Sequence, residues 1–434
     1  MTQGVDRDHA AITIAVVGDC IIARHISSLD DVAEVRRLLS SADVSLGNLE
    51  SAIVDVSGDP RRGPDALGQM WIVAPPGIAE DLRAMGLDGV ARANNHATDW
   101  GAESMFETSR ALELARVAHA GAGQDLDAAR APAFLQTSAG QVAFVSVTTT
   151  GRAEARATRS SPRATAHPGV SAIATTREVL VTSAQLELLR RIQAEHPSVA
   201  ADTAGVTGDA ALDFFGVRFA SGPGTGGYRY RADPADLREF VESVRQCRAA
   251  AALVIVSIHA HEPGNWSDRP ADFLQSLARE AIDAGASAVF GHGPHRIRGI
   301  ELYRGRPILY SLGNFVFQAD ALDPAALEAA AELSEGLDPS DVSALMKLWT
   351  NLKTGSDRAA HRGLLAAMTF SNGQLCASSL VPLDLSGEHH PGARGLPRVA
   401  AGAAAQSILE EVQQLSLPFM TKIRILKDTG EIVL

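Results

Sequence analysis

Five apolar segments of this sequence are each followed by side chains that commonly bind metal ions. In chain order these side chains are Asp19, Glu50, Asn95 with His96, His259 with His261, and His292 with His295. Carboxylates, an amide and imidazoles offer the anionic oxygens and neutral nitrogens that two borderline divalent ions need, with one carboxylate shared between the ions. The residue types therefore predict a binuclear metal site if the fold brings the five segments together.

The spacing of the histidines is more informative than any one residue. A lone His is more often a core or surface group than a metal ligand. His259 and His261 are two residues apart, which places both imidazoles on one face of an extended chain. His292 and His295 are separated by Gly293 and Pro294 and need a bent loop. The two pairs are therefore the stronger indication of a site.

The segments that position these residues alternate between short β-branched runs and amphipathic stretches, which is typical of an α/β fold. Strands are predicted at residues 11–19, 43–50, 87–96, 141–149, 253–262 and 287–295, with helices after most of them. Residues 300–317 contain Arg304-Gly305-Arg306 between two apolar runs, which predicts a hairpin turn. In an α/β sheet the functional loops follow the strand ends, where the candidate ligands lie.

The chain is predicted to form one catalytic domain over residues 1–320. Residues 151–235 differ from the rest, being basic and then Gly-rich and aromatic, and we expect an insertion or lid there. Within it, GPGTGG at 222–227 is interpreted as a flexible loop, because no Lys-Ser or Lys-Thr follows to form a phosphate loop. Residues 321–434 are expected to complete or flank the same domain, with helices at 326–336, 343–352 and 407–416 and strands at 363–370 and 374–385.

The composition excludes several classes of partner. A formal charge of -12 repels nucleic acid and anionic membrane surfaces at long range. The three cysteines, Cys20, Cys247 and Cys376, form no CxxC pair, which suits a reducing compartment, and Cys20 is expected in the core. No signal peptide or membrane anchor is visible, so we expect a cytoplasmic location and no membrane partner. The sequence leaves open whether the chain forms a homodimer.

Several motifs resemble the CapA-type family of poly-γ-glutamate synthesis proteins, which is similar in fold to the calcineurin-like metallophosphoesterases. The motifs are GDCIIAR (18–24), GNLES (47–51), ANNHATDWG (93–101), HAHE (259–262) and GHGPHRIRGIELYRGRPILYSLGNFVF (291–317). They span about three hundred residues in the family's order, and the last block is the most specific. The resemblance implies a metallophosphoesterase-like sandwich of β-sheets flanked by helices.

The resemblance also implies a role for each candidate residue. Asp19 is the first-strand metal carboxylate, Glu50 the carboxylate that bridges the two ions, and Asn95 an amide ligand. His259 and His292 are ligands of one ion, and His295 or His261 completes the site of the other. His96, beside Asn95, is the proton donor or the group that stabilises the transition state.

Two positions depart from the family pattern. Relatives of this fold usually have a His two residues after the first Asp, where this chain has Ile21, so the first metal site is expected to be weaker or built differently. In the fourth motif His259-Ala260-His261 replaces the common His-Trp-Gly, which adds a candidate ligand.

Each of the remaining candidate site residues allows a functional and a structural interpretation. We hypothesise that Asp99 orients His96 as a general acid; alternatively, Asp99 only caps the helix that begins near Gly101. Arg24 is a candidate clamp for a substrate carboxylate or phosphate, and a surface ion pair is the alternative. Arg296 and Arg298 are similar candidates. Tyr310, Ser311 and Asn314 are expected to support the strand beneath the site.

These observations favour a binuclear metal-dependent hydrolase using two divalent ions, with Mn, Zn and Fe as candidates. A shared water of lowered pKa would become the hydroxide that attacks an amide, such as a γ-glutamyl amide, or a phosphoester of a small anionic substrate. The alternative function is a non-catalytic accessory protein of a poly-γ-glutamate or capsule-type biosynthesis complex. An amide-forming role is disfavoured because no nucleotide-binding loop is visible.

Overall fold

A computed structural model describes residues 11–26, 30–55, 72–195, 210–222, 227–318, 357–387 and 394–434. The helices predicted at 326–336 and 343–352 lie outside the described residues, as do residues 223–226 of the predicted GPGTGG loop.

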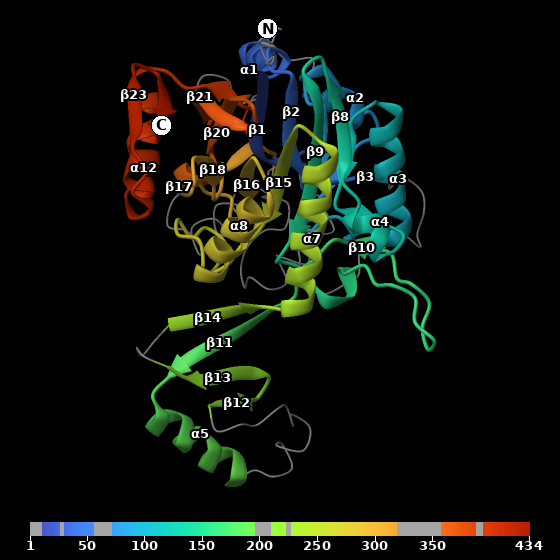
Figure 1. Cartoon of the computed structure of the whole chain (residues 1–434), viewed down its shortest axis with the longest axis vertical. Helices are drawn as coiled ribbons and strands as arrows, with labels where there is room; N and C mark the ends of the chain where they lie inside the picture. Colours follow the sequence, from blue (N-terminus) through green and yellow to red (C-terminus); the bar gives the residue numbers. More distant parts are fainter. Residues whose placement is uncertain are drawn as a thin grey trace, which may run out of the picture.

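The larger sheet has ten strands and is built around β1, which carries Asp19 (Figure 1). Its main path runs β23 (Ile423–Leu426), β24 (Thr429–Ile432), β21 (Gln374–Asp384), β20 (Arg362–Ser371), β1 (Ile12–Ile21), β2 (Val44–Leu49), β5 (Gly89–Ala91) and β6 (Ala118–Ala120). In addition β19 (Asn314–Phe317) pairs with β1, and β22 (Arg398–Val399) pairs with β21. Strands β1, β2, β5 and β6 are parallel, so their carboxyl ends lie at one edge of the sheet.

The second sheet has six strands and supplies the histidine pairs. Its order is β17 (Ile300–Tyr303), β18 (Arg306–Leu309), β16 (Ala288–His292), β15 (Leu253–His259), β9 (Gly140–Thr148) and β8 (Ala133–Thr137). The inner strands are parallel to one another. The predicted hairpin is present: Arg304 and Gly305 join β17 to β18 and both have positive φ, as a tight two-residue hairpin turn requires.

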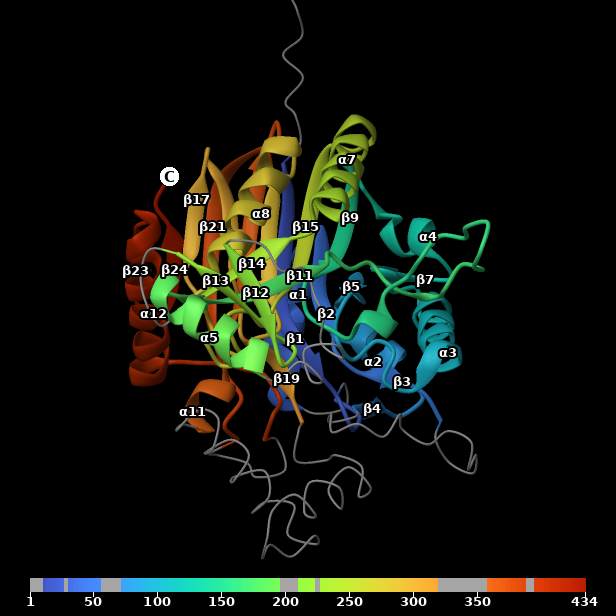
Figure 2. The ribbon, with the colours of Figure 1, turned by 90° about the horizontal axis from the view of Figure 1, so that it is seen from below.

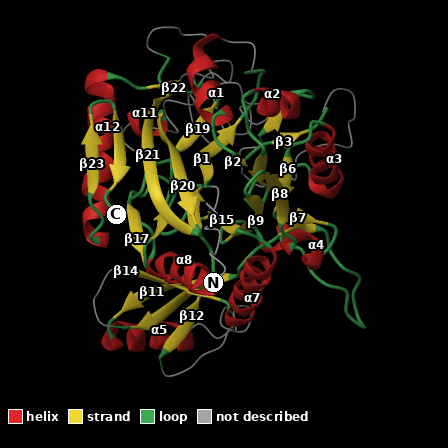
Figure 3. Cartoon of the chain, turned by 45° about the horizontal axis from the view of Figure 1, so that its top comes forward, coloured by secondary structure: helices red, strands yellow, loops and turns green. Residues whose placement is uncertain are grey.

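The two sheets pack face to face and helices cover their outer faces (Figure 3). Along β1, Ile14 and Val16 pack against the second sheet, whereas Ala15 and Val17 pack beneath the helices. This alternation follows from the two-residue period of a strand. Helices α1 (Ala33–Ser40), α2 (Ile78–Ala84) and α3 (Gly101–Leu114) cover the first sheet, and α7 (Pro234–Ala250) and α8 (Asp272–Ala284) cover the second. The expected α/β class, with sheets flanked by helices, is confirmed.

The C-terminal segments join the same body. Strands β20 and β21 extend the first sheet next to β1. Helix α12 (Gly402–Ser416) contacts β21 and β23 of that sheet and β17 of the other. The remaining short elements are β3 (Ala52–Ile53), β4 (Val73–Ala74), β7 (Ala122–Gly123), α4 (Leu126–Arg130), β10 (Gly169–Val170) and α11 (Asp357–Ala360).

The described parts of residues 175–232, here called the inserted lobe, form a four-stranded sheet of their own below the main body (Figure 1), and Figure 2 views the molecule from that side. The lobe contains β11 (Thr175–Val181), α5 (Ser183–Glu195), β12 (Ala211–Phe214), β13 (Val217–Ser221) and β14 (Gly227–Ala232). Its two ends meet, because the N–H of Asp233 donates to the carbonyl of Ala174 at 2.7 Å. Within the described residues, no helix has the length and apolar character needed to cross a bilayer.

Candidate metal centre

The strand ends of both sheets meet where the sequence places its metal-binding residues. Asp19 lies on β1, which pairs with β2, the strand that precedes Glu50. In the second sheet His259 of β15 is the register partner of His292 of β16. Asn95 follows β5, the next strand of the first sheet. Residues nearly three hundred positions apart in the chain are thus neighbours in space.

Asp19, His259 and His292 form the first of two potential metal-binding groups. One ligand atom from each lies within 4.8 Å of the other two, and all three residues are buried. The Nδ1 atom of His292 is 3.6 Å from Oδ1 of Asp19. An oxygen and two nitrogens around one point make half of an octahedral or most of a tetrahedral site.

Glu50, His261 and His295 form the second group, under the same 4.8 Å limit. The family resemblance implied His259 and His292 for one ion and His295 or His261 for the other; in the structure His259 and His292 share the first group, and both His261 and His295 lie in the second. Asp19 touches both groups, since its Oδ2 is 3.6 Å from Nδ1 of His295.

The two groups are in contact with each other through His259. Its Nε2 atom lies 3.1 Å from Nε2 of His261 and 3.7 Å from Oε1 of Glu50. Oδ1 of Asn95 lies 2.8 Å from the same Nε2 atom. The seven predicted ligands therefore form one cluster.

Burial sets the protonation states inside this cluster. It lowers the pKa of His292 to about 4, although the nearby Asp19 charge opposes the shift. Burial, together with the neighbouring histidines, holds the pKa values of His259 and His261 well below the ordinary value. All three imidazoles are consequently neutral at pH 7, which is the form that binds a metal ion.

Glu50 shows that the cluster suits a cation. Neither of its side-chain oxygens has a hydrogen-bond partner among the described residues, although the residue is completely buried. Burial and the adjacent Asp19 carboxylate raise the pKa of Glu50 well above its usual value. A buried carboxylate without a partner is costly, and divalent cations would remove that cost. The donor set and this orphaned carboxylate both fit a pair of divalent ions.

Surrounding polar groups fix the orientation of the candidate ligands. Ser257 Oγ lies 2.6 Å from Nε2 of His292, so Nδ1 of that ring faces the cluster. Asn48 donates to Oδ1 of Asp19 at 2.8 Å, and the N–H of Gly293 donates to Oδ2 at 2.9 Å. Asn314 Oδ1 is 3.1 Å from Nδ1 of His295. Asn314 was expected to support the strand; it also orients a candidate ligand.

His96 and Asp99 form the predicted pair. Nδ1 of His96 lies 2.6 Å from Oδ2 of Asp99, and Nε2 of His96 lies 4.0 Å from Oε1 of Glu50. The ring therefore has one nitrogen held by a buried carboxylate and the other beside the cluster. Helix α3 begins at Gly101 with Trp100 as its N-cap, and no side chain caps it. The helix-capping interpretation of Asp99 is thus not what the structure shows.

The three candidate arginines are engaged elsewhere. Arg24 donates through Nη2 to the carbonyl oxygen of Arg394 at 3.0 Å. Arg298 is completely buried and donates to the backbone carbonyls of Ala260, His261 and Ser267, so it supports the loop that carries His261. The Nη2 atom of Arg296 lies 3.6 Å from Oε1 of Glu411. The interpretation of Arg298 as a substrate clamp is wrong, because the carbonyls occupy its guanidinium.

Two residues outside the motifs, Ser257 and Thr150, hold candidate ligands in place and were not predicted from the sequence. Ser257 lies within a plain apolar strand, and only the sheet register puts it beside His292. Thr150 accepts a hydrogen bond at its hydroxyl from the N–H of His261 at 2.9 Å. Thr150 also donates to Glu262 at 3.0 Å. Ser257 and Thr150 have no local sequence signal, whereas Glu262 belongs to the HAHE motif and was identifiable.

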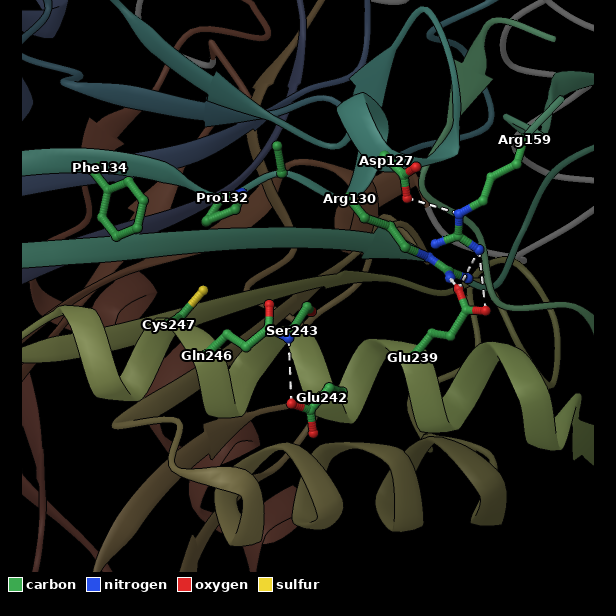
Figure 4. Close-up of a pocket in the computed structure, with 11 residues that line it drawn as sticks. Asp127, Arg130, Pro132, Phe134, Arg159, Glu239, Glu242, Ser243, Gln246 and Cys247 are labelled. Carbon is green, nitrogen blue, oxygen red and sulfur yellow. Dashed lines mark hydrogen bonds and ion pairs between the residues drawn. The ribbon is translucent and has the colours of Figure 1, made fainter. Parts of the chain in front are cut away.

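One pocket lies away from the candidate ligands and another lies beside them. The larger, of about 520 Å³, lies between α4, β8 and α7, away from the metal centre, and Figure 4 shows it. The smaller, of about 140 Å³, is lined by Thr148–Ala153, Arg156, Val170 and residues 172–175. The smaller pocket adjoins the centre, because its wall includes Thr150, which holds the backbone of His261.

The chain is similar to one protein family and to several bacterial proteins. The family described as "Bacterial capsule synthesis protein PGA_cap" matches residues 13–319. The uncharacterised protein y4sH of Sinorhizobium fredii is 37% identical over 95% of this chain and 91% of its own length. The capsule biosynthesis protein CapA of Bacillus anthracis is 23% identical over 72% of this chain and 61% of its own.

Among solved structures, one described as a novel phosphatase from Mycoplasma pneumoniae aligns with a TM-score of 0.42 and 11% identity, over 89% of this chain and 96% of that one.

Proposed function

Since the chain belongs to the bacterial capsule synthesis protein family PGA_cap, and its strand ends converge as described, we propose that it is a binuclear metal-dependent hydrolase. Its metal ligands are Asp19, Glu50, Asn95, His259, His261, His292 and His295. Its substrate is a small anionic amide of the γ-glutamyl type or a phosphoester.

The observation that carries this proposal is the pairing of buried acids with neutral imidazoles. Asp19 and Glu50 are both completely buried, and neither contacts a Lys or Arg side chain within the described segments. Two carboxylates in a low-dielectric interior repel each other and lose their hydration. Divalent cations held by these acids and the imidazoles would offset both costs.

Chemistry at the site divides between the ions and the chain. When bound, two divalent cations would supply positive charge for a developing oxyanion and lower the pKa of a water molecule. His96 donates a proton to the leaving group from its Nε2 atom, because its Nδ1 atom is held by Asp99 at 2.6 Å. Ser257, Asn48 and Asn314 hold the ligands in place, so that the centre does not reorganise during the reaction.

Metal analysis with a matched pair of variants tests the proposal. His292→Ala removes a buried candidate ligand, and His167→Ala removes an exposed histidine of a loop outside the centre. After reconstitution with Mn, Zn, Fe or Co, we expect about two ions per chain in the wild type and in His167→Ala, and fewer in His292→Ala. Chelation should abolish turnover of a panel of γ-glutamyl amides and phosphoesters.

The result decides between two functions. A wild-type protein that binds no ion, or a His292→Ala variant that retains full turnover, would refute the hydrolase. The sequence also allows a non-catalytic accessory protein of a capsule-type complex, and Ile21 favours it, because this buried residue occupies the place of a ligand histidine in relatives of this fold. Two bound ions without hydrolysis of any panel member would support that second function.

A further inference from the structure

The smaller pocket, of about 140 Å³, shares a wall with the metal centre. The N–H of Thr149 donates to the carbonyl of His259 at 3.0 Å, and the hydroxyl of Thr150 accepts from the N–H of His261 at 2.9 Å. A Cβ atom on Gly151 would lie 3.8 Å from Cα of Asn95. The loop 148–153 that lines the pocket therefore contacts two candidate metal ligands, His259 and His261, directly and lies close to a third, Asn95.

Two arginines line this pocket, and the described residues offer a side-chain partner to only one of them. Arg156 is paired with Asp236 at 2.5 Å. Arg152 is partly buried, and among the described residues its guanidinium makes no hydrogen bond and no ion pair. The hydroxyls of Thr149 and Thr150 already donate to Glu262, at 2.9 and 3.0 Å. Arg152 is thus the donor that remains for a ligand.

The larger pocket of Figure 4 differs in this respect. Its two arginines, Arg130 and Arg159, both pair with Glu239, and Arg159 also pairs with Asp127 at 2.8 Å. The cations there are neutralised by the protein itself. A ligand anion would have to displace these carboxylates, whereas the described residues place no carboxylate against the guanidinium of Arg152.

Part of the wall of the small pocket is apolar. Val170, Ala172 and Ile173 line it and are buried. Its volume is below the roughly 300–1,000 Å³ that encloses a whole drug-sized ligand. It suits one end of a substrate: an anionic group at Arg152 and a short hydrocarbon chain against the apolar residues.

We propose that this pocket is a substrate-binding subsite in which Arg152 binds a carboxylate carried on a short aliphatic chain, while the scissile bond lies at the metal centre. The inference rests on the proposed hydrolase and deepens it, because it favours amides of carboxylated aliphatic acids over simple phosphoesters. Arg152 is a specificity-determining residue; it takes no part in the bond cleavage.

Binding of a small probe tests the subsite without any reaction. Butyrate carries the proposed group, butyramide is its uncharged analogue, and inorganic phosphate is a different anion. Affinities for the full chain, in the metal state in which it purifies, would be measured by calorimetry at low ionic strength. Arg152→Ala and Arg152→Gln are compared with Arg163→Ala, which removes an exposed arginine of the same segment outside the pocket.

We expect butyrate to bind the wild type and Arg163→Ala equally, and at least roughly tenfold more weakly to both Arg152 variants, as for loss of a charged hydrogen-bond donor. Butyramide should not distinguish the variants, and phosphate affinity should not depend on Arg152. The subsite is wrong if the wild type does not bind butyrate, or if a folded Arg152→Gln variant binds butyrate as tightly as the wild type does. A phosphate affinity that alone depends on Arg152 would overturn the carboxylate assignment.

The subsite and the hydrolase fail in different ways. If butyrate binding depends on Arg152 while no amide or phosphoester is hydrolysed, the subsite stands and the hydrolase is wrong. If a carboxylated amide is hydrolysed with the same KM by the wild type and by Arg152→Gln, the hydrolase stands and the subsite is wrong.

Discussion

At the scale of single residues, the metal centre depends on burial acting in opposite directions on acids and bases. Burial favours neutral forms, so it lowers the pKa of His292 and raises that of Glu50. The imidazoles are thereby held in the form that binds a cation, whereas the raised pKa of Glu50 makes its carboxylate easier to protonate. Metal affinity should therefore fall as the pH is lowered, because protons and metal ions compete for the same atoms.

Asp99 provides a prediction about a single contact. Asp99→Asn keeps the shape of the side chain but removes the negative charge that holds Nδ1 of His96 at 2.6 Å. We expect kcat to fall by roughly 10², with metal content unchanged, because the loss concerns proton donation and not the ions. The decrease should be larger for amides with alkylamine leaving groups than for nitroanilides, which need little protonation.

A control separates this role from a structural one. Asp127→Asn changes a solvent-exposed carboxylate that contacts Arg159 and lies outside the centre, so kcat should stay at the wild-type value. An equal loss of kcat for good and poor leaving groups in Asp99→Asn would show that Asp99 does not act through a proton donor.

At the scale of elements, the loop after β16 determines whether the histidines can converge. Gly293 has a φ of +110°, a conformation that L side chains rarely adopt, and its N–H binds Asp19. The same backbone lies against two imidazoles, because a Cβ atom there would be 2.9 Å from Cδ2 of His261 and 3.0 Å from Cε1 of His259. A methyl group has no room at this position.

Gly293→Ala should consequently damage the centre more than the fold. We expect it to lose bound metal and to lower the free energy of unfolding by about 1–3 kcal/mol, the usual cost of a strained backbone residue. Gly227→Ala is the control: among the described residues no heavy atom lies within 4 Å of its Cβ position, and we expect a change below about 0.5 kcal/mol. Elemental analysis and denaturant titration would measure both quantities; wild-type metal content in Gly293→Ala would contradict the argument.

At the scale of the whole molecule, the chain leaves the main body for the inserted lobe and returns to it at neighbouring points. The ends of the lobe meet at the hydrogen bond from Asp233 to Ala174, and β11 and β14 are paired from Thr175 with Ala232 onwards. Asp233 also caps helix α7 through its side chain, independently of the lobe. Because the two ends of the lobe are adjacent, its insertion adds little loop-closure cost to the body.

Excision of residues 175–232, with Ala174 joined to Asp233 by two glycines, should therefore leave a folded protein. We expect the thermal unfolding midpoint and the metal content to stay near the wild-type values. The lost contacts include the packing of Tyr230 on Phe273, with ring centroids 5.7 Å apart, and its hydrogen bond to the carbonyl of Pro263. Excision exposes the ring of Phe273, so a second excised chain carries Phe273→Gln to remove this apolar surface. If both excised chains are insoluble, the lobe is part of the core.

The sequence by itself determined the residue types of the centre and the class of the fold. Short apolar runs, turn residues and the placement of Asp19, Glu50 and the histidines after strands are local patterns, set within a few residues of chain. The hairpin at Arg304 and Gly305 is equally local, because its turn needs positive φ at those two positions. Such features depend on backbone preferences that act before any packing.

Tertiary structure alone decided which side chains meet and which charges are already satisfied. The division of the histidines into two groups depends on how two sheets pack, as does the contact of Ser257 with His292. In the sequence Arg298 and Arg152 are equivalent cations, yet three backbone carbonyls hold one and the described residues offer the other no partner. Charge pairing and burial are set by distances between remote segments, and a linear sequence does not encode those distances locally.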